Sequence, residues 1–179
     1  MSLGRLFAPR LFAPRPAAAA GRRLYAAAVA QARQPALYEG LGAPDTPEGR
    51  FELYTLHVVL LLHRLKGQGP RAAETGQALF DAYVRALDDG LRELGVGDLS
   101  VGKKMRKLGE AFYGRAKAYD QALEDGPGLE ALEALIGRTL EGADSAGVAR
   151  YAADTGGALA RQPLEHLLEG EVEWPKIAV

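Results

Sequence analysis

Residues 95–120 read GVGDLSVGKKMRKLGEAFYGRAKAYD, and their apolar pattern predicts a long amphipathic helix. Asp98 and Ser100 stand just before this pattern, where the side chain of a helix cap would lie. Beyond them, apolar residues recur at intervals of three, four or seven positions and therefore share one helix face: Val101, Met105, Leu108, Phe112, Tyr119 and Leu123. We expect this face to pack into a protein core.

The rest of this helix carries dense positive charge. Its cations are Lys103, Lys104, Arg106, Lys107, Arg115 and Lys117, and Glu110 and Asp120 alone oppose them. A positive helix face can bind an anionic partner. The partner-binding candidates are therefore Asp98, Ser100, Lys103, Lys104, Arg106, Lys107 and Arg115. The alternative is that these charges form the ordinary solvated face of a helix and serve solubility alone.

Helical spacing also marks the segments on either side of this stretch. Residues 47–66 are apolar nearly all round, and Thr46 before Pro47 suits a helix start, so this segment is the expected central helix. Further helices are expected over residues 24–33, 72–94, 129–140 and 148–159. No segment alternates as a strand does. The sequence thus predicts an all-α fold, an irregular bundle of about six or seven helices.

Length and composition agree with one helical domain. The 179 residues are 47% hydrophobic and 25% charged, which suffices for a single core. We assign the domain to residues 21–170 and a C-terminal tail to residues 171–179. The chain contains no cysteine, which excludes a disulfide scaffold, a thiolate metal site and a cysteine nucleophile.

Residues 1–20 are predicted to form a flexible, arginine-rich arm. The first 38 residues contain six arginines and no acidic residue, and the motif Arg-Leu-Phe-Ala-Pro occurs at 5–9 and again at 10–14. Arginines interleaved with aromatic residues can contact an anionic membrane surface. The membrane-contact candidates are Arg5, Arg10, Arg15, Phe7 and Phe12. The competing interpretation is an organelle-targeting presequence, although the prolines oppose the amphipathic helix that it needs.

No set of catalytic or metal-binding groups is evident, so we expect no enzyme activity, cofactor or metal. The histidines are His57, His63 and His166, and the first two fall on different sides of one helix. Residues 97–104 nearly match a phosphate-binding loop, but Lys104 stands where serine or threonine should bind magnesium. The preceding segment has helical spacing and not that of a strand, which argues against nucleotide binding.

Several motifs carry a family resemblance over residues 24–119. They are Asp45-Thr-Pro-Glu-Gly-Arg-Phe51, Leu56-His57, Gln77-Ala-Leu-Phe-Asp81, Gly95-Val-Gly-Asp-Leu-Ser-Val-Gly-Lys-Lys-Met105 and Phe112-Tyr-Gly-Arg115. In order and spacing they resemble the ubiquinol-cytochrome c chaperone family. The ending Gly170-Glu-Val-Glu-Trp-Pro175 is similar to that of its bacterial members.

The resemblance implies a non-enzymatic, all-α assembly factor for respiratory complex III. Its implied partner is cytochrome b, nascent or newly inserted, with the ribosome and a small partner subunit as further partners. The implied location is the bacterial cytoplasm, peripheral at the inner membrane; the alternative is the matrix side of the mitochondrial inner membrane. No DNA partner is expected.

Two other function classes remain open. One is an RNA- or ribosome-binding module that acts through the basic helix 101–119, although Phe112, Tyr113 and Tyr119 follow the core-facing period and stacking platforms must be exposed. The other is an enzyme whose site lies in a bundle pocket, which would require convergent polar groups.

Overall fold

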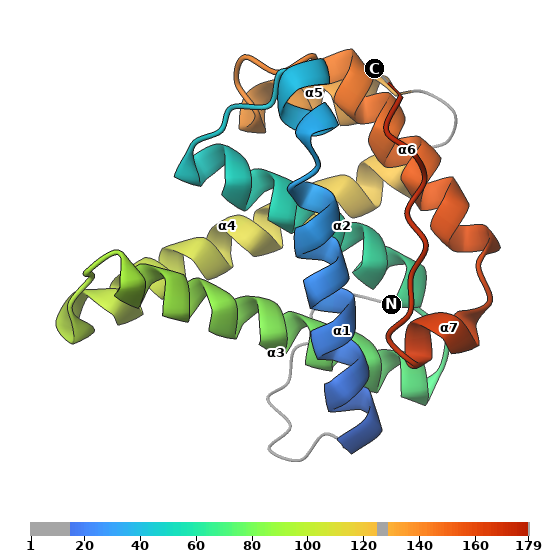
Figure 1. Ribbon diagram of the computed structural model, residues 1–179, viewed down its shortest axis with the longest axis horizontal. Helices are drawn as coiled ribbons and strands as arrows, with labels where there is room; N and C mark the ends of the chain where they lie inside the picture. Colours follow the sequence, from blue (N-terminus) through green and yellow to red (C-terminus); the bar gives the residue numbers. More distant parts are fainter. Residues whose placement is uncertain (1–14, 125–128, 179) are drawn as a thin grey trace.

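The computed structural model describes residues 15–124 and 129–178, and all regular elements within them are helices (Figure 1). In chain order these are α1 (Arg15–Ala32), the π-helical turn η2 (Ala36–Gly40), α2 (Pro47–Leu65), α3 (Pro70–Glu93), α4 (Asp98–Glu124), α5 (Glu130–Thr139), α6 (Ser145–Arg161) and α7 (Leu164–Leu168). The expected all-α, single-domain fold is confirmed.

Helix α2 is the central element, as its apolar sequence predicts. The Thr46 hydroxyl accepts a hydrogen bond from the Gly49 amide at 3.1 Å, and Pro47 follows in the first turn. Most of its residues are buried, and it packs against α1, α3, α4 and α6. Figure 1 shows α2 near the middle of the molecule, with these helices around it.

Helix α1 begins at Arg15 and not at Leu24, so the expected helix start was wrong. Residues 15–20 were assigned to the arm, yet they are helical and the side chains of Ala17 and Ala20 are buried. Pro16 is the second residue of the helix, where its missing N–H costs nothing. The alanine-rich sequence then favours the helix and lets α1 lie close to α3.

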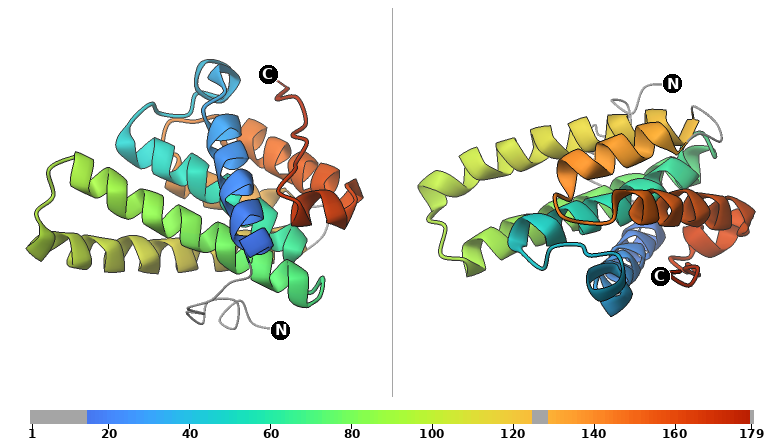
Figure 2. Two further views of the ribbon diagram at one scale, coloured as in Figure 1. Left: turned by 60° about the horizontal axis from the view of Figure 1, so that its bottom comes forward. Right: turned by 90° about the horizontal axis from the view of Figure 1, so that it is seen from above.

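Helices α3 and α4 form a long antiparallel hairpin. Gly95 has a φ of 79°, a left-handed conformation that glycine adopts readily, and lies in the turn between them. Near the body of the protein, the rings of Phe80 and Tyr83 each lie 5.1 Å from that of Phe112. The far end of the hairpin projects away from α6 and α7 (Figures 1 and 2).

The described part of the tail, residues 171–178, packs against the bundle. The Gln162 side chain donates to the Glu173 carbonyl at 2.7 Å and accepts from the Glu173 amide at 3.0 Å. The Trp174 ring lies 5.3 Å from the His57 ring, and Val172 and Ile177 pack on the core. The left view in Figure 2 shows the tail running beside α1.

Candidate partner-binding surface

The outer side of α4 carries a basic face, which we define as Lys103, Lys104, Arg106, Lys107 and Lys117. All five side chains are exposed. None of them has an ion-pair partner among the side chains that the structure describes. The opposite side of the helix is turned inward and contributes buried residues to the core, among them Val101, Phe112, Ala116 and Tyr119.

The α3–α4 hairpin adds apolar surface to this charge. Among the described residues, the large hydrophobic side chains classed as exposed are Leu94, at 74% exposure, and Tyr113, at 43%. Leu94 directly precedes the turn at Gly95, and Tyr113 lies further along α4, between Lys107 and Lys117 in the sequence. The hairpin therefore presents both positive charge and exposed apolar side chains to a partner.

Arg115 differs from the other partner-binding candidates because it is held inside the fold. Its Nε lies 2.9 Å from Oε2 of Glu52, and its Nη2 lies 2.9 Å from Oε1 of the same carboxylate. Glu52 is buried on α2, and its hydrogen bond raises the pKa of Arg115. This two-point ion pair joins α4 to α2.

The two remaining candidates lie at the start of α4. Asp98 is its first residue. Ser100 is exposed, and its amide donates to the Gly97 carbonyl at 2.8 Å. The sequence placed both residues before the helix as caps, whereas the structure places them in its first turn.

The histidines have separate environments and do not converge. His57 is fully buried, with Nδ1 2.7 Å from the Leu53 carbonyl and Nε2 2.7 Å from the Tyr151 hydroxyl. A carbonyl only accepts, so Nδ1 donates to it, and the neutral ring accepts at Nε2 from Tyr151. His166 is exposed on α7. In the described part of the chain, no group of three or more His, Cys, Asp or Glu residues could hold a metal ion.

Asp120 organises a polar cluster that the sequence pattern does not predict. Its Oδ1 lies 2.7 Å from Nδ1 of His63, and its Oδ2 lies 2.6 Å from Nζ of Lys66. Burial alone would raise the pKa of Asp120, but the hydrogen bonds from Lys66 and His63 lower it overall. His63 in the last turn of α2 and Lys66 directly after the helix are three positions apart, and this spacing was the available signal, but it does not reveal a partner on α4.

The membrane-contact candidates Arg5, Phe7, Arg10 and Phe12 lie outside the described residues. Arg15 is the first residue of α1, and its side chain is not described. Within residues 15–124 and 129–178, no helix has the length and apolar character needed to span a membrane.

Comparison with known proteins assigns the chain to a family. The model of the family described as "Ubiquinol-cytochrome C chaperone" matches residues 39–174. The chain belongs to the ubiquinol-cytochrome c chaperone family. The predicted resemblance is therefore confirmed, and the match extends beyond residue 119 through α5, α6 and α7 to Trp174 of the tail.

A solved member of similar fold is described as the crystal structure of the Cbp3 homolog from Brucella abortus. It is 34% identical to this chain, with a TM-score of 0.82, and the alignment covers 91% of this chain and 92% of that one. The comparison with curated proteins finds no match. The bundle is thus shared across nearly the whole length of a bacterial relative.

Proposed function

We propose that this protein is a non-catalytic assembly factor that binds newly made cytochrome b and supports biogenesis of the ubiquinol-cytochrome c reductase complex. The observation that carries the proposal is family membership over residues 39–174, together with the fold shared with the Brucella relative. Cytochrome b is nascent or newly inserted when it is bound. The ribosome and a small partner subunit are the further partners that we propose.

We place partner binding on the basic face of α4 and the adjoining hairpin end. The charges of this face are exposed and have no acidic partner among the described side chains, so an anionic surface can approach them without breaking internal ion pairs. Leu94 adds apolar area that association would bury. Association through such a surface weakens as salt concentration rises.

Reversal of the basic face tests this placement. We expect the triple variant Lys103→Glu, Lys104→Glu and Lys107→Glu to keep its helical content and to lose cytochrome b in affinity purification from membranes. The matched control is Arg138→Glu, Arg150→Glu and Lys176→Glu, which changes the net charge equally at exposed positions on α5, α6 and the tail. Mass spectrometry should recover cytochrome b with the control. Equal recovery with a folded triple variant would reject the placement.

The arm is proposed to add a peripheral contact with an anionic membrane on the cytoplasmic side of the bacterial inner membrane. Arg5, Arg10 and Arg15 would lie near lipid phosphates, and Phe7 and Phe12 would enter the interface. Each cation near an acidic lipid surface contributes about 1 kcal/mol. The proposal rests on sequence, because four of these residues lie outside the described part of the chain.

The RNA-binding alternative loses support from the environment of its aromatic residues. Phe112 is 1% exposed and Tyr119 is fully buried, so neither ring can stack on a base without local opening. Tyr113 remains accessible. Recovery of ribosomal RNA without cytochrome b in the affinity purification would favour this alternative over the assembly factor.

A further inference from the structure

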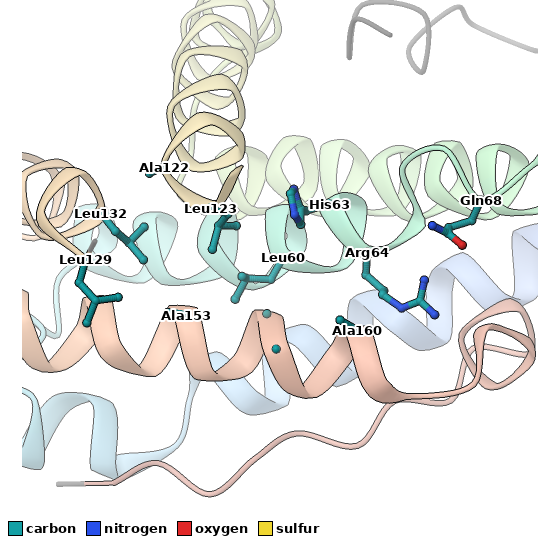
Figure 3. Close-up of a pocket in the computed structure, with 12 residues that line it drawn as sticks. Leu60, His63, Arg64, Gln68, Ala122, Leu123, Leu129, Leu132, Ala153 and Ala160 are labelled. Atoms are coloured by element: carbon teal, nitrogen blue, oxygen red, sulfur yellow. The ribbon is translucent and has the colours of Figure 1, made fainter. Parts of the chain in front are cut away.

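A pocket of about 560 Å³ opens between α2, the end of α4, the start of α5 and α6 (Figure 3). Its volume lies within the range of roughly 300–1,000 Å³ found for small-molecule sites. It is separate from the basic face, because α4 contributes only Ala122 and Leu123 near its C-terminal end.

The two ends of the pocket differ in chemistry. Figure 3 shows the leucine side chains gathered at one end: Leu60, Leu123, Leu129 and Leu132. Arg64 and Gln68 lie at the other end, and His63 lies between the two groups. The pocket is therefore amphipathic along its length.

The polar end carries positive charge. Arg64 donates from Nε to the Leu159 carbonyl at 2.8 Å and from Nη2 to the Gln162 carbonyl at 3.0 Å. These two carbonyls lie at the C-terminal end of α6, where the helix dipole is equivalent to roughly half a negative elementary charge. They therefore offset only part of the positive charge of Arg64. No carboxylate among the described side chains forms an ion pair with Arg64.

A second guanidinium lies beside the same wall. A Cβ built at Gly157, which lines the pocket, would be 3.5 Å from Nη1 of Arg161. Arg161 is exposed and likewise has no ion-pair partner among the described side chains. Arg64 thus lines the pocket and Arg161 lies next to its α6 wall, and neither guanidinium has a carboxylate partner among the described side chains.

Two glycines leave part of the side of α6 that faces the pocket without side chains, although the packing there would accept a Cβ. Ala153, Gly156, Gly157 and Ala160 line the pocket at helical spacing. A Cβ at Gly156 would lie 3.7 Å from Leu123 and 3.9 Å from Leu60, which are ordinary contacts. Glycine inside a helix is less stable than alanine, so local helix preference does not explain these two glycines.

We propose that this pocket binds a single-chain amphiphile with an anionic head group. The acyl chain lies among the leucines and removes apolar surface from water. The head group, a carboxylate in the simplest case, accepts hydrogen bonds from Arg64 and Arg161, which match its charge and can bind it at two points. The α6 glycines leave room for the chain to pass between these two ends.

The probe is dodecanoate, titrated below its micellar concentration into the full-length protein and followed by calorimetry. We expect saturable binding at one site, and weaker binding of dodecyltrimethylammonium, whose chain is the same and whose head group is cationic. Gly156→Leu fills the pocket and should weaken dodecanoate binding about tenfold or more. Gly90→Leu on α3, where an added Cβ has nothing within 4 Å, is the matched control and should bind as the wild type does.

Wild-type amide NMR signals provide a readout that does not depend on the folding of Gly156→Leu. Dodecanoate should shift Gly156 and Gly157 and leave Gly90 on α3 unchanged. Several results would overturn the proposal: no saturable binding, equal binding by a folded Gly156→Leu, tighter binding of the cationic amphiphile, or shifts confined to other elements. Binding of an apolar helical peptide with no binding of dodecanoate would assign the pocket to a protein partner instead. None of these results bears on the assembly function, since the two surfaces are separate.

Discussion

His57 is a neutral base held inside the core. Burial lowers its pKa from 6.5 to about 4, partly offset by the hydrogen bond to Leu53. Tyr151 donates to its other nitrogen and in turn accepts a hydrogen bond from Gln31 at 3.0 Å. One chain of polar contacts thus connects α1, α2 and α6, so protonation of His57 would disturb the junction of three helices.

The lowered pKa makes folding depend on pH in a definite direction. The unfolded chain takes up a proton near pH 6.5 and the folded chain only near pH 4. The contribution of neutral His57 to the free energy of unfolding is therefore fully present above pH 6.5. It is lost as the pH falls toward 4, and the loss is on the order of 3 kcal/mol.

Urea unfolding at a series of pH values measures this loss. His57→Gln should be less stable at neutral pH and should show a smaller fall in unfolding free energy over this interval. His166→Gln, at an exposed position, is the control and should keep the wild-type profile. An unchanged profile in folded His57→Gln would show that His57 is not the group responsible.

The ion pair between Arg115 and Glu52 gives a second prediction for a single residue. Arg115→Met leaves the buried Glu52 carboxylate without its partner and should cost about 3 kcal/mol of unfolding free energy. Lys107→Met, on the exposed basic face, should change it by less than about 0.5 kcal/mol. The double variant Glu52→Leu, Arg115→Met should recover most of the loss. Equal stability of the two single variants would contradict a structural role for Arg115.

At the scale of the element, helix α1 depends on a close crossing with α3. A Cβ at Gly21 would overlap the Ala78 backbone carbonyl carbon and lie 2.5 Å from the Leu79 backbone nitrogen. Backbone atoms cannot move aside as a flexible side chain can. The crossing therefore requires glycine on α1.

Replacement of Gly21 should separate the two helices. Gly21→Ala should lower the unfolding free energy by about 1–3 kcal/mol, because α1 has to move away from α3. Gly90→Ala is the matched control, since nothing lies within 4 Å of its added Cβ, and it should raise stability by about 0.5–1 kcal/mol. Thermal and urea unfolding measure both changes. A neutral or stabilising effect at Gly21 would contradict the crossing.

The helices that were predicted best are those with a long apolar face. Periodicity placed α2, α3 and α4 and the shorter α5 and α6 close to their observed ranges, because burial of one face decides where such helices form. The prolines of the arm argue against a helix, but Pro16 lies in the first turn of α1, where proline is tolerated, so the start of α1 was not predicted. Helix α7, η2 and the packing of Trp174 on His57 depend on tertiary contacts that no local pattern indicates.

Part of the candidate surface could also be predicted from the sequence. The period of α4 predicted that Lys103, Lys104, Arg106 and Lys107 share the side opposite the core, and these residues are exposed. The engagement of Arg115 by Glu52 was not predictable, since the two residues are far apart in sequence and meet only through the packing of α2 on α4. The amphipathic pocket could not be predicted from the sequence either, because four helices that are distant in sequence contribute to it.

At the scale of the whole molecule, charge is unevenly distributed although the net charge is only -1. The six arginines of the first 38 residues and the basic face of α4 are positive, and acidic residues predominate over the rest of the chain. Such a distribution orients a protein toward an anionic partner or membrane and keeps the acidic regions away from it. The helical scaffold holds the basic face at a projecting hairpin (Figure 1).

The most direct test of the proposed function is the amount of assembled ubiquinol-cytochrome c reductase in membranes of cells that lack this protein. Native gel electrophoresis and the absorbance of haem b should show a loss of assembled complex. Return of the wild type or of the Arg138, Arg150 and Lys176 control should restore it, and the Lys103, Lys104 and Lys107 variant should not. Normal levels of assembled complex in cells without the protein would contradict the account.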